Sequence, residues 1–462
     1  MLNLRLKLFI LLFILPFHIG AAGSTTRYVS ALITPVYLSP GNSIIYTLNK
    51  CATSLMATPL KRTLSLSQIT LYGIGTILGA GIYVLLGEVA LVSGSFTPVA
   101  FLVAAIVVSF SAYSYRHLAR RFPYSAGEAV YVQEAFASTH LSRLVGLTIV
   151  FSGIVSAATI ARGFTGYFAI LVTLPDAVMI ILLIGSLTAL ASWGVRQSVN
   201  VAVATTFVEI FGIGVVIWAS FDSLPSLLER PQQYFAPLSL PAWSGIAAGA
   251  FIAFYAFIGF EDMVNMAEEV KDPEKNMFRG IVLALIITAS LYVVVALCAV
   301  AAVPLEKLAG NKAPLALIVE HNTQFPVSAM AAISMVAIIN GALLQIIMCA
   351  RVLYGMGKRG MIPAALAKVH DHTQTPVFAT LLVGTCVMIF ALALPLVTLA
   401  KITSLFILSV FTLVNASLLA LNWRSKQRTF MQLLLPATGA VICITFILLH
   451  LLLEFADINK SF

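Results

Sequence analysis

Hydrophobic residues form long runs along most of the chain, and short charged or turn-forming stretches separate these runs. A helix of about 20 apolar residues is long enough to cross the hydrocarbon core of a bilayer. The pattern predicts eleven such helices, at approximately residues 66–92, 97–116, 144–172, 177–194, 199–221, 243–266, 280–303, 326–355, 377–397, 401–422 and 430–454. We therefore expect an all-α polytopic membrane protein.

Composition and charge agree with this class. Of the 462 residues, 60% are hydrophobic and only 10% are charged, whereas soluble domains carry about 25% charged residues. Of the lysines and arginines in the predicted loops, 17 lie on the side of Lys61 and 5 on the other. Because basic loops stay in the cytoplasm, topology explains the net charge of +9 without a nucleic-acid partner. The five cysteines form no CxxC pair, so we expect no metal site, disulfide framework or cofactor.

The first 60 residues form a separate N-terminal extension. The segment MLNLRLKLFILLFILPFHIGAAGS has a basic start, an apolar core and a small-residue end, as secretory signal peptides do. Cleavage there would place Lys61 outside, against the loop charges. The alternative is that the native chain starts at Met56, and the sequence leaves both open.

The first predicted span is unusually rich in glycine. Its segment YGIGTILGAGIYVLLG holds Gly73, Gly75, Gly79 and Gly81, although glycine weakens a helix interior by about 0.5–1 kcal/mol. The spacing does not fit a dinucleotide-binding loop. Gly75 and Gly79 could serve close helix packing. Alternatively, the helix is interrupted, which membranes tolerate only where the backbone faces protein or a cavity.

A second span favours the interruption. Residues 251–269, FIAFYAFIGFEDMVNMAEE, carry Gly259 near the middle, followed by Glu261 and Asp262. Interrupted helices at corresponding positions of two halves indicate an inverted-repeat transporter. The predicted parts are the extension at 1–60, a ten-helix core at 64–422 with repeats at 66–221 and 243–422, and an accessory helix at 430–454.

Three segments resemble the amino acid–polyamine–organocation (APC) superfamily. LSLSQITLYGIGTILGAGIYVLLG is similar to its first helix, and AFIGFEDMVNMAEEVKDPEKNMFRGI to its sixth helix and the next loop. ARVLYGMGKRGMIPAALAKVHDHTQTP is similar to its eighth helix and the loop beyond. Many members have twelve spans, and Phe278 stands where the family often has proline. The resemblance implies an amino acid permease with a five-plus-five inverted-repeat (LeuT-like) fold, discontinuous first and sixth helices and about 11 transmembrane helices.

The resemblance also implies a substrate site. By position, the N–H groups of Ala80 and Gly81 would hold an α-carboxylate, and the carbonyl groups of Ile77, Tyr255 and Ile258 an α-ammonium group.

The physical chemistry of an interrupted helix agrees with such a site. A half-helix that begins near Gly79 presents free N–H groups and the positive end of its dipole to an anion. Tyr255 stands where relatives place an aromatic gate, although it could equally be an ordinary aromatic residue of an aromatic-rich helix.

Two carboxyl groups are candidates for proton coupling. Glu209 lies inside the fifth span, NVAVATTFVEIFGIGVVIW. A carboxylate at the bilayer centre costs about 2.5–3.5 kcal/mol on insertion scales, and such residues usually mark ion or proton pathways. Glu261 follows the predicted break in the sixth span. The alternative for Glu209 is a hydrogen-bonded side chain that braces helices. Residues 117–143 are mixed in character and predict an amphipathic segment at the cytoplasmic surface.

The sequence therefore predicts a secondary active transporter that moves amino acids across the cell (inner or plasma) membrane by alternating access, coupled to protons. An amino acid/amine exchanger and a polyamine transporter are alternatives, as is an amino acid sensor that does not transport. No HExxH or GxSxG motif appears, and we do not expect an enzyme. The expected partners are an amino acid, protons and the lipid bilayer. The oligomeric state stays open.

Overall fold

The computed structural model describes residues 62–460, apart from residues 124–126, 194–198, 230, 236–238, 371–372, 374 and 427–428. The N-terminal extension, with both predictions made for it, lies outside the described residues. Leu60–Phe462 forms one compact unit.

A helix coincides with each of the eleven predicted spans. These helices are α5 (Leu66–Ser93), α6 (Thr97–Arg121), α8 (Thr139–Leu171), α9 (Asp176–Trp193), α10 (Val199–Ala219), α13 (Leu240–Phe254), α14 (Pro273–Ala302), α17 (Val327–Lys358), α18 (Val377–Ala393), α19 (Leu396–Trp423) and α20 (Phe430–Lys460). By length and composition, nine helices of the described part could cross a membrane. One of them, Gly81–Arg121, runs through two predicted spans, and Val377–Ala393 is a shorter apolar helix.

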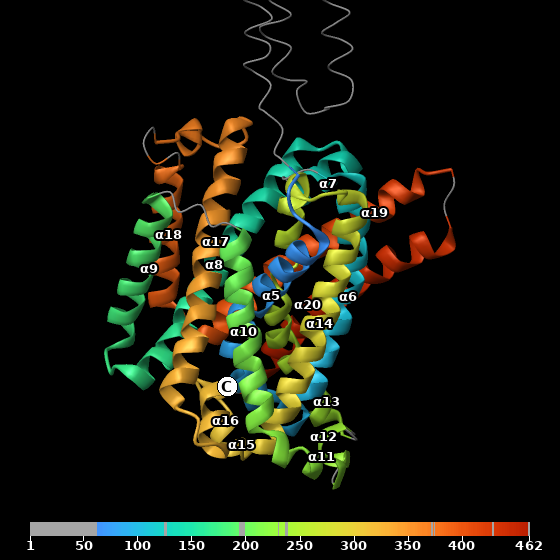
Figure 1. Ribbon diagram of the computed structural model, residues 1–462. Helices are drawn as coiled ribbons and strands as arrows, with labels where there is room; N and C mark the ends of the chain where they lie inside the picture. The colour runs from blue at the N-terminus through green and yellow to red at the C-terminus, as the bar shows by residue number, and fades with distance from the viewer. Residues whose placement is uncertain are drawn as a thin grey trace, which may run out of the picture. The chain divides into compact units, whose positions relative to one another are not determined.

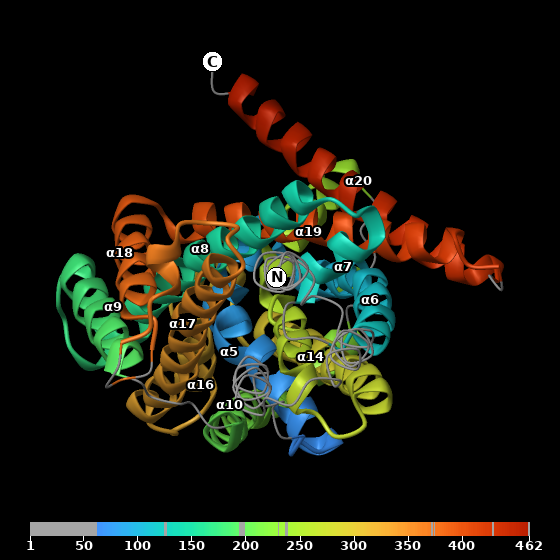
Figure 2. The same cartoon turned by 90° about the horizontal axis from the view of Figure 1, so that it is seen from above.

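The helices pack so that α5 lies among members of both predicted repeats. It contacts α6, α8 and α10 as well as α13, α14 and α17 (Figures 1 and 2). The most extensive packing joins α8 to α17 and α6 to α14. The last helix, α20, packs along α19 and also touches α6 and α13. A short helix between α6 and α8, α7 (Gly127–Phe136), packs on α8 and α19.

The first and sixth spans are both interrupted, as the glycine pattern predicts. In α5 the backbone at Gly79 leaves the helical region, with φ 3° and ψ −97°. The sixth span stops at the end of α13 and continues as one short turn, η4 (Tyr255–Phe257). Ile258 is then extended, Gly259 takes φ +127°, and the chain resumes as the 3₁₀ helix η5 (Glu261–Glu269). At Gly259 this positive φ favours glycine over any other residue.

Backbone hydrogen bonds join the inner ends of the two interrupted spans. The N–H groups of Thr63 and Leu64 both donate to the carbonyl oxygen of Glu269, at 2.9 and 3.0 Å. In return the N–H of Lys271 donates to the carbonyl oxygen of Leu64 at 2.9 Å. The segment that enters α5 is therefore tied to the segment that leaves η5.

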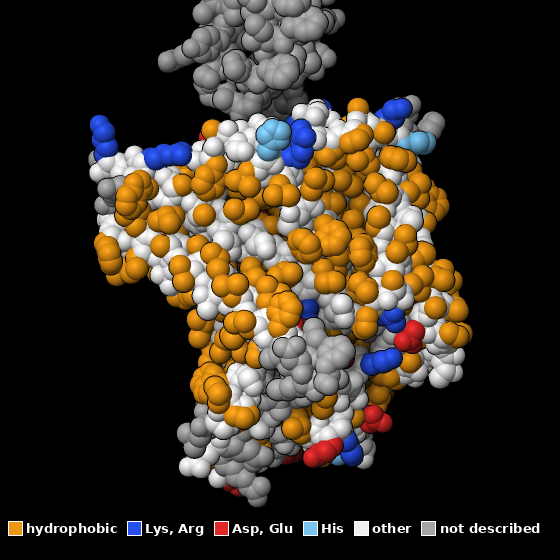
Figure 3. All heavy atoms as spheres, turned by 180° about the vertical axis from the view of Figure 1, so that it is seen from behind, with side chains coloured by type: hydrophobic (Ala, Val, Ile, Leu, Met, Phe, Trp, Pro, Cys, Tyr) orange, Lys and Arg blue, Asp and Glu red, His pale blue; other side chains and the backbone are white. Residues whose placement is uncertain are grey.

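The surface carries the charge pattern expected of a membrane protein. Hydrophobic side chains cover the broad middle of the face in Figure 3, lysine and arginine lie along its upper end, and basic and acidic side chains are mixed on its lower part. Most of the large exposed hydrophobic residues lie on the spans, among them Leu182, Phe211, Ile286 and Leu452. Such a contiguous apolar surface suits contact with lipid.

Candidate functional site

A small cavity lies where the two interrupted spans meet. Ile77, Gly79 and Gly81 of α5 line it together with Tyr255 and Ile258 from the break in the sixth span. These are five of the six residues predicted for substrate binding. The sixth, Ala80, lies between two of them in the chain, and the structure does not describe its side chain. The cavity volume of about 30 Å³ is room for one or two water molecules.

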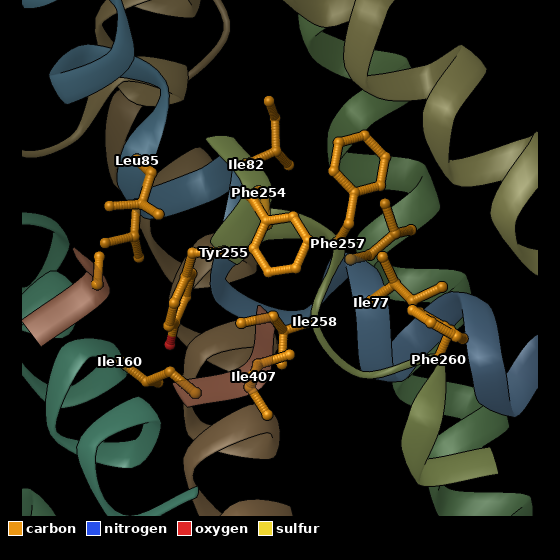
Figure 4. Close-up of a cluster of buried hydrophobic side chains, with 14 of the residues drawn as sticks. Ile77, Ile82, Leu85, Ile160, Phe254, Tyr255, Phe257, Ile258, Phe260 and Ile407 are labelled. Carbon is orange, nitrogen blue, oxygen red and sulfur yellow. The ribbon is translucent and has the colours of Figure 1, made fainter. Parts of the chain in front are cut away.

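Side chains from α8 and α17 complete this cavity. Ser156 and Ile160 face it from α8, and Gly341, Leu344 and Gln345 from α17. Figure 4 shows Tyr255 and Ile258 next to each other at the unwound segment, on the side that carries Ile160. The walls therefore combine peptide groups of the two breaks with small, polar and aliphatic side chains.

Glycine lets the two breaks approach each other closely. A Cβ atom on Gly81 would lie 2.5 Å from the Cα atom of Ala256. A Cβ atom on Gly259 would lie 2.5 Å from the carbonyl oxygen of Thr76. Both distances are shorter than any van der Waals contact, so each position requires glycine for packing between the breaks.

Two hydroxyl groups hold the unwound segments together. Tyr292 of α14 donates to the carbonyl oxygens of Ile77 and Ala256, at 2.6 and 2.9 Å. Thr76 lies within hydrogen-bonding distance, as donor, of the carbonyl oxygens of Gly73 and Gly259, at 3.0 and 3.1 Å. The sequence analysis missed both residues, because nothing in a tyrosine within an apolar helix or a threonine within a glycine-rich one indicates a distant carbonyl partner.

Tyr255 is anchored to α8. Its hydroxyl group lies 2.9 Å from the hydroxyl oxygen of Ser156 and donates to the Ser156 carbonyl oxygen at 3.0 Å. The side chain is 4% exposed and lines the cavity at the break. Tyr255 stands at the position where relatives have an aromatic gate, and its hydroxyl group is bonded to a helix of the other predicted repeat.

A much larger vestibule begins next to this cavity. Its volume is about 690 Å³, and its walls include Tyr72, Glu269, Arg351 and Tyr354. Asp262 and Leu344 line both the vestibule and the small cavity, so the two spaces meet at these residues. The vestibule lies towards the basic loops that the charge pattern places in the cytoplasm.

The opposite end of α5 is packed shut. Gly310 donates a backbone hydrogen bond to Gly87 at 2.9 Å, and a Cβ atom on Gly87 would collide with the backbone of Asn311. Lys312 forms an ion pair with Asp176 of α9 at 3.3 Å. This conformation is therefore open at the basic end and closed at the other.

Glu209 is fully buried on α10. It lines neither the small cavity nor the vestibule, and it does not line the second small cavity that contains Glu261. Its carboxyl oxygens make no hydrogen bond of ordinary geometry to a described residue, and Asn340 of α17 is the side chain with which it interacts. Its backbone carbonyl oxygen accepts a hydrogen bond from Tyr83 of α5 at 2.7 Å. The backbone at Glu209 is therefore bonded to the outer half of the interrupted first span.

Glu261 follows the break in the sixth span, two residues after Gly259. Its Oε2 atom accepts a hydrogen bond from the N–H of Gly259 at 2.9 Å, and the side chain is 6% exposed. It lines a second small cavity that also holds Asp262 and Glu128. The structure therefore does not bring the two predicted coupling residues, Glu209 and Glu261, into one site, and it adds two carboxyl groups that the sequence analysis did not select.

The interrupted spans, the cavity between them and the one-sided vestibule define this chain as a polytopic membrane transporter with the LeuT-like fold. Among solved structures, one titled as MhsT in complex with L-phenylalanine shares the fold, with a TM-score of 0.60, 12% identity, and 85% of this chain and 100% of that chain covered. A family model described as amino acid permease matches residues 64–460, and the chain belongs to that family, within the APC superfamily.

Curated relatives are similar over most of the chain. The branched-chain amino acid permease BcaP of Bacillus subtilis (strain 168) is 28% identical over 80% of this chain and 82% of the relative. The mitochondrial cationic amino acid transporter 3 of Arabidopsis thaliana is 28% identical over 79% of this chain. The matched region spans 63% of that longer relative. The similarity therefore covers the helical core of transporters whose names state different amino acids.

Proposed function

We propose that this protein is a secondary active transporter that carries an amino acid across a cell (inner or plasma) membrane by alternating access, coupled to protons. The observation that carries the proposal is the cavity between the two breaks, lined by Ile77, Gly79, Gly81, Tyr255 and Ile258. Peptide groups that face a cavity at such a break suit a zwitterion, because N–H groups bind carboxylates and a carbonyl oxygen, which has two lone pairs, can accept from ammonium beside an existing bond. The names of the relatives support an amino acid as the substrate.

Alternating access is supported by the asymmetry of the open space. The vestibule of about 690 Å³ ends at Asp262 beside the small cavity, whereas the far end of α5 is packed against Gly310 and Asn311. A transporter needs the converse conformation as well, in which the vestibule closes and the far end opens. The small cavity of about 30 Å³ has to widen to hold an amino acid.

Proton coupling is supported by the buried carboxyl group of Glu209. A carboxylate within the membrane is costly, so such groups usually serve an ion or proton pathway. The Glu209 backbone accepts a hydrogen bond from Tyr83 of the interrupted α5, and its side chain interacts with Asn340 of α17. Protonation of the Glu209 side chain would remove a buried charge that lies near both Tyr83 and Asn340, which links proton binding to the surroundings of α5 and α17.

Reconstituted protein tests the proposal in two steps. A thermal-shift screen of the twenty amino acids and common amines identifies the ligand, and counterflow of labelled ligand in proteoliposomes tests transport. A ligand that stabilises the protein without counterflow would indicate a sensor, and ligand exchange without net uptake would indicate an exchanger. Stabilisation by polyamines alone would indicate a polyamine transporter.

Uptake at two pH values then tests the coupling. We expect Glu209→Gln to lower uptake driven by a pH gradient at least tenfold while counterflow remains. Glu320→Gln, at an exposed glutamate of α16 (Pro314–Asn322), is the matched control. Normal gradient-driven uptake by both Glu209→Gln and Glu261→Gln would refute coupling through these groups.

A further inference from the structure

A second small cavity adjoins the cavity at the breaks and shares Ser156, Ile258, Asp262 and Gln345 with it. Its volume is about 20 Å³, which is room for about one water molecule. Three carboxyl groups line it: Glu128 from α7, and Glu261 and Asp262 from η5. Their exposed fractions are 4%, 6% and 7%.

No lysine, arginine or histidine of the described chain lines either small cavity. Glu128 accepts a hydrogen bond from the hydroxyl group of Tyr115 of α6 at 3.1 Å, and Glu261 accepts one from Gly259. The Asp262 side chain makes no hydrogen bond to a described residue, although it is more than nine-tenths buried and lines all three spaces. One buried carboxyl group therefore faces the cavities without a partner in the described chain.

The surroundings of the cluster contain little to offset its negative charge. Around Glu128 the titratable groups are Tyr115 of α6, Tyr131 of its own helix, and Glu261 and Asp262 of η5. The side chains that α8, α17 and α19 contribute to this cavity are uncharged. On the vestibule side, Asp262 faces Tyr72, Glu269, Cys349 and Arg351.

Three carboxyl groups in so dry a space cannot all be ionised, since burial and mutual repulsion both oppose charge. Burial raises the pKa of Glu128 to about 7, against the opposing effects of a backbone hydrogen bond and the Tyr115 hydroxyl group. A metal ion is a poor candidate for the missing positive charge, because the described residues hold no group of three His, Cys, Asp or Glu side chains placed to bind one. In this conformation the cavity of about 20 Å³ has no room for a substrate side chain.

We propose that Glu128, Glu261 and Asp262 form a second proton-binding site, separate from Glu209, which exchanges protons with the vestibule through Asp262. A proton passes from vestibule water to the Asp262 carboxylate, and from there through one water to Glu261 or Glu128, whose carboxylate becomes a carboxylic acid. Release reverses these steps. The role of this site in transport rests on the proposed function, whereas its existence does not.

Infrared titration of the purified protein tests the site directly. In the wild-type protein we expect a protonated-carboxyl band that is lost as pH rises through about 7, and this band should be absent from Glu128→Gln. Tyr115→Phe should move its midpoint to higher pH, because the hydrogen bond from Tyr115 favours the ionised form. Glu128→Asp should restore a titrating band. Glu134→Gln, at an exposed position on the same helix, is the matched control.

Transport in proteoliposomes tests the role of the site. We expect Glu128→Gln to abolish the dependence of uptake on internal pH near 7 and to lower gradient-driven accumulation at least tenfold, with counterflow within twofold of wild type.

An unchanged infrared band in a folded Glu128→Gln protein would overturn the proposal. So would a change of preference from cationic to neutral amino acids without a change in pH dependence, because Glu128 would then bind substrate. A titrating band without any gradient-driven uptake by the wild-type protein would refute proton coupling and leave the proton site in place.

Discussion

The hydroxyl oxygen of Tyr292 lies 2.6 Å from the carbonyl oxygen of Ile77 and bonds at the same time to the carbonyl oxygen of Ala256. Ile77 precedes the break in α5, and Ala256 lies within the break of the sixth span. One side chain of α14 thus fixes the distance between the two unwound segments. The candidate site therefore depends on a residue that does not line its cavity.

Removal of this hydroxyl group should impair binding. We expect Tyr292→Phe to destabilise the protein by roughly 1–3 kcal/mol, the cost of unsatisfied buried polar groups, and to weaken ligand binding at least tenfold. Thermal unfolding with and without ligand measures both effects. Tyr167→Phe is the matched control, because Tyr167 is also buried and donates to a single carbonyl oxygen, that of Tyr83, at 2.6 Å. Equal losses of ligand affinity in the two variants would contradict the inference that Tyr292 positions the two unwound segments for ligand binding.

The contact between Gly81 and Ala256 leaves no room for a methyl group. In Gly81→Ala the new Cβ atom would meet the Cα, Cβ and carbonyl oxygen of Ala256, none of which can rotate away. We expect a loss of stability of roughly 1–3 kcal/mol and loss of counterflow. Gly214→Ala on α10 should leave both unchanged, because nothing lies within 4 Å of its Cβ position. Full transport by Gly81→Ala would show that the breaks do not pack this closely during transport.

The one-sided vestibule predicts one-sided labelling. Gly355 lines the vestibule and has open space at its Cβ position. In a protein with Cys51 and Cys386 changed to serine, Gly355→Cys should react with a membrane-impermeant maleimide in inside-out vesicles, but not in right-side-out vesicles. Gly87→Cys should not be labelled from either side in this conformation, since the backbone of Asn311 occupies its Cβ position. Labelling of Gly355→Cys from the outer side would reverse the orientation.

The pKa of Glu128, raised to about 7 by burial, predicts how stability depends on pH. Between its ordinary pKa and about 7 the folded state binds more protons than the unfolded state, so the free energy of unfolding falls as pH rises through this window. The full effect is roughly 3 kcal/mol. The unfolding temperature of Glu128→Gln should decline less between pH 5 and pH 8 than that of wild type or Glu134→Gln. Parallel declines in all three would mean that Glu128 is ionised throughout.

Hydropathy and glycine spacing were sufficient to predict the main features of this fold. Each predicted span coincides with a helix, because about 20 apolar residues have few other arrangements in a bilayer. The interruptions followed from Gly79 and Gly259, which leave helical geometry near the middle of membrane-length runs. The substrate roles of the predicted residues and the division into repeats stay predictions.

The polar partners of the site could not be predicted from local pattern. Tyr292 is separated by 215 residues from Ile77, and only tertiary packing brings them together. Glu128 lies in the mixed segment 117–143, which predicts an amphipathic surface helix, yet α7 turns this carboxyl group inward to Tyr115. Glu128 lies more than 130 residues before the adjacent pair Glu261 and Asp262, and only the fold puts the three carboxyl groups in one cavity.

The hydrogen bonds between Leu64 and the segment from Glu269 to Lys271 couple two parts of the molecule that the breaks would otherwise release. The inner half of α5 and the η5 segment are joined at their cytoplasmic ends and meet again at Gly259 and Thr76. These contacts hold the two segments together at both ends. Any movement of η5 would shift Asp262, and with it the wall that the vestibule and the small cavity share, so a change in one space would alter the other.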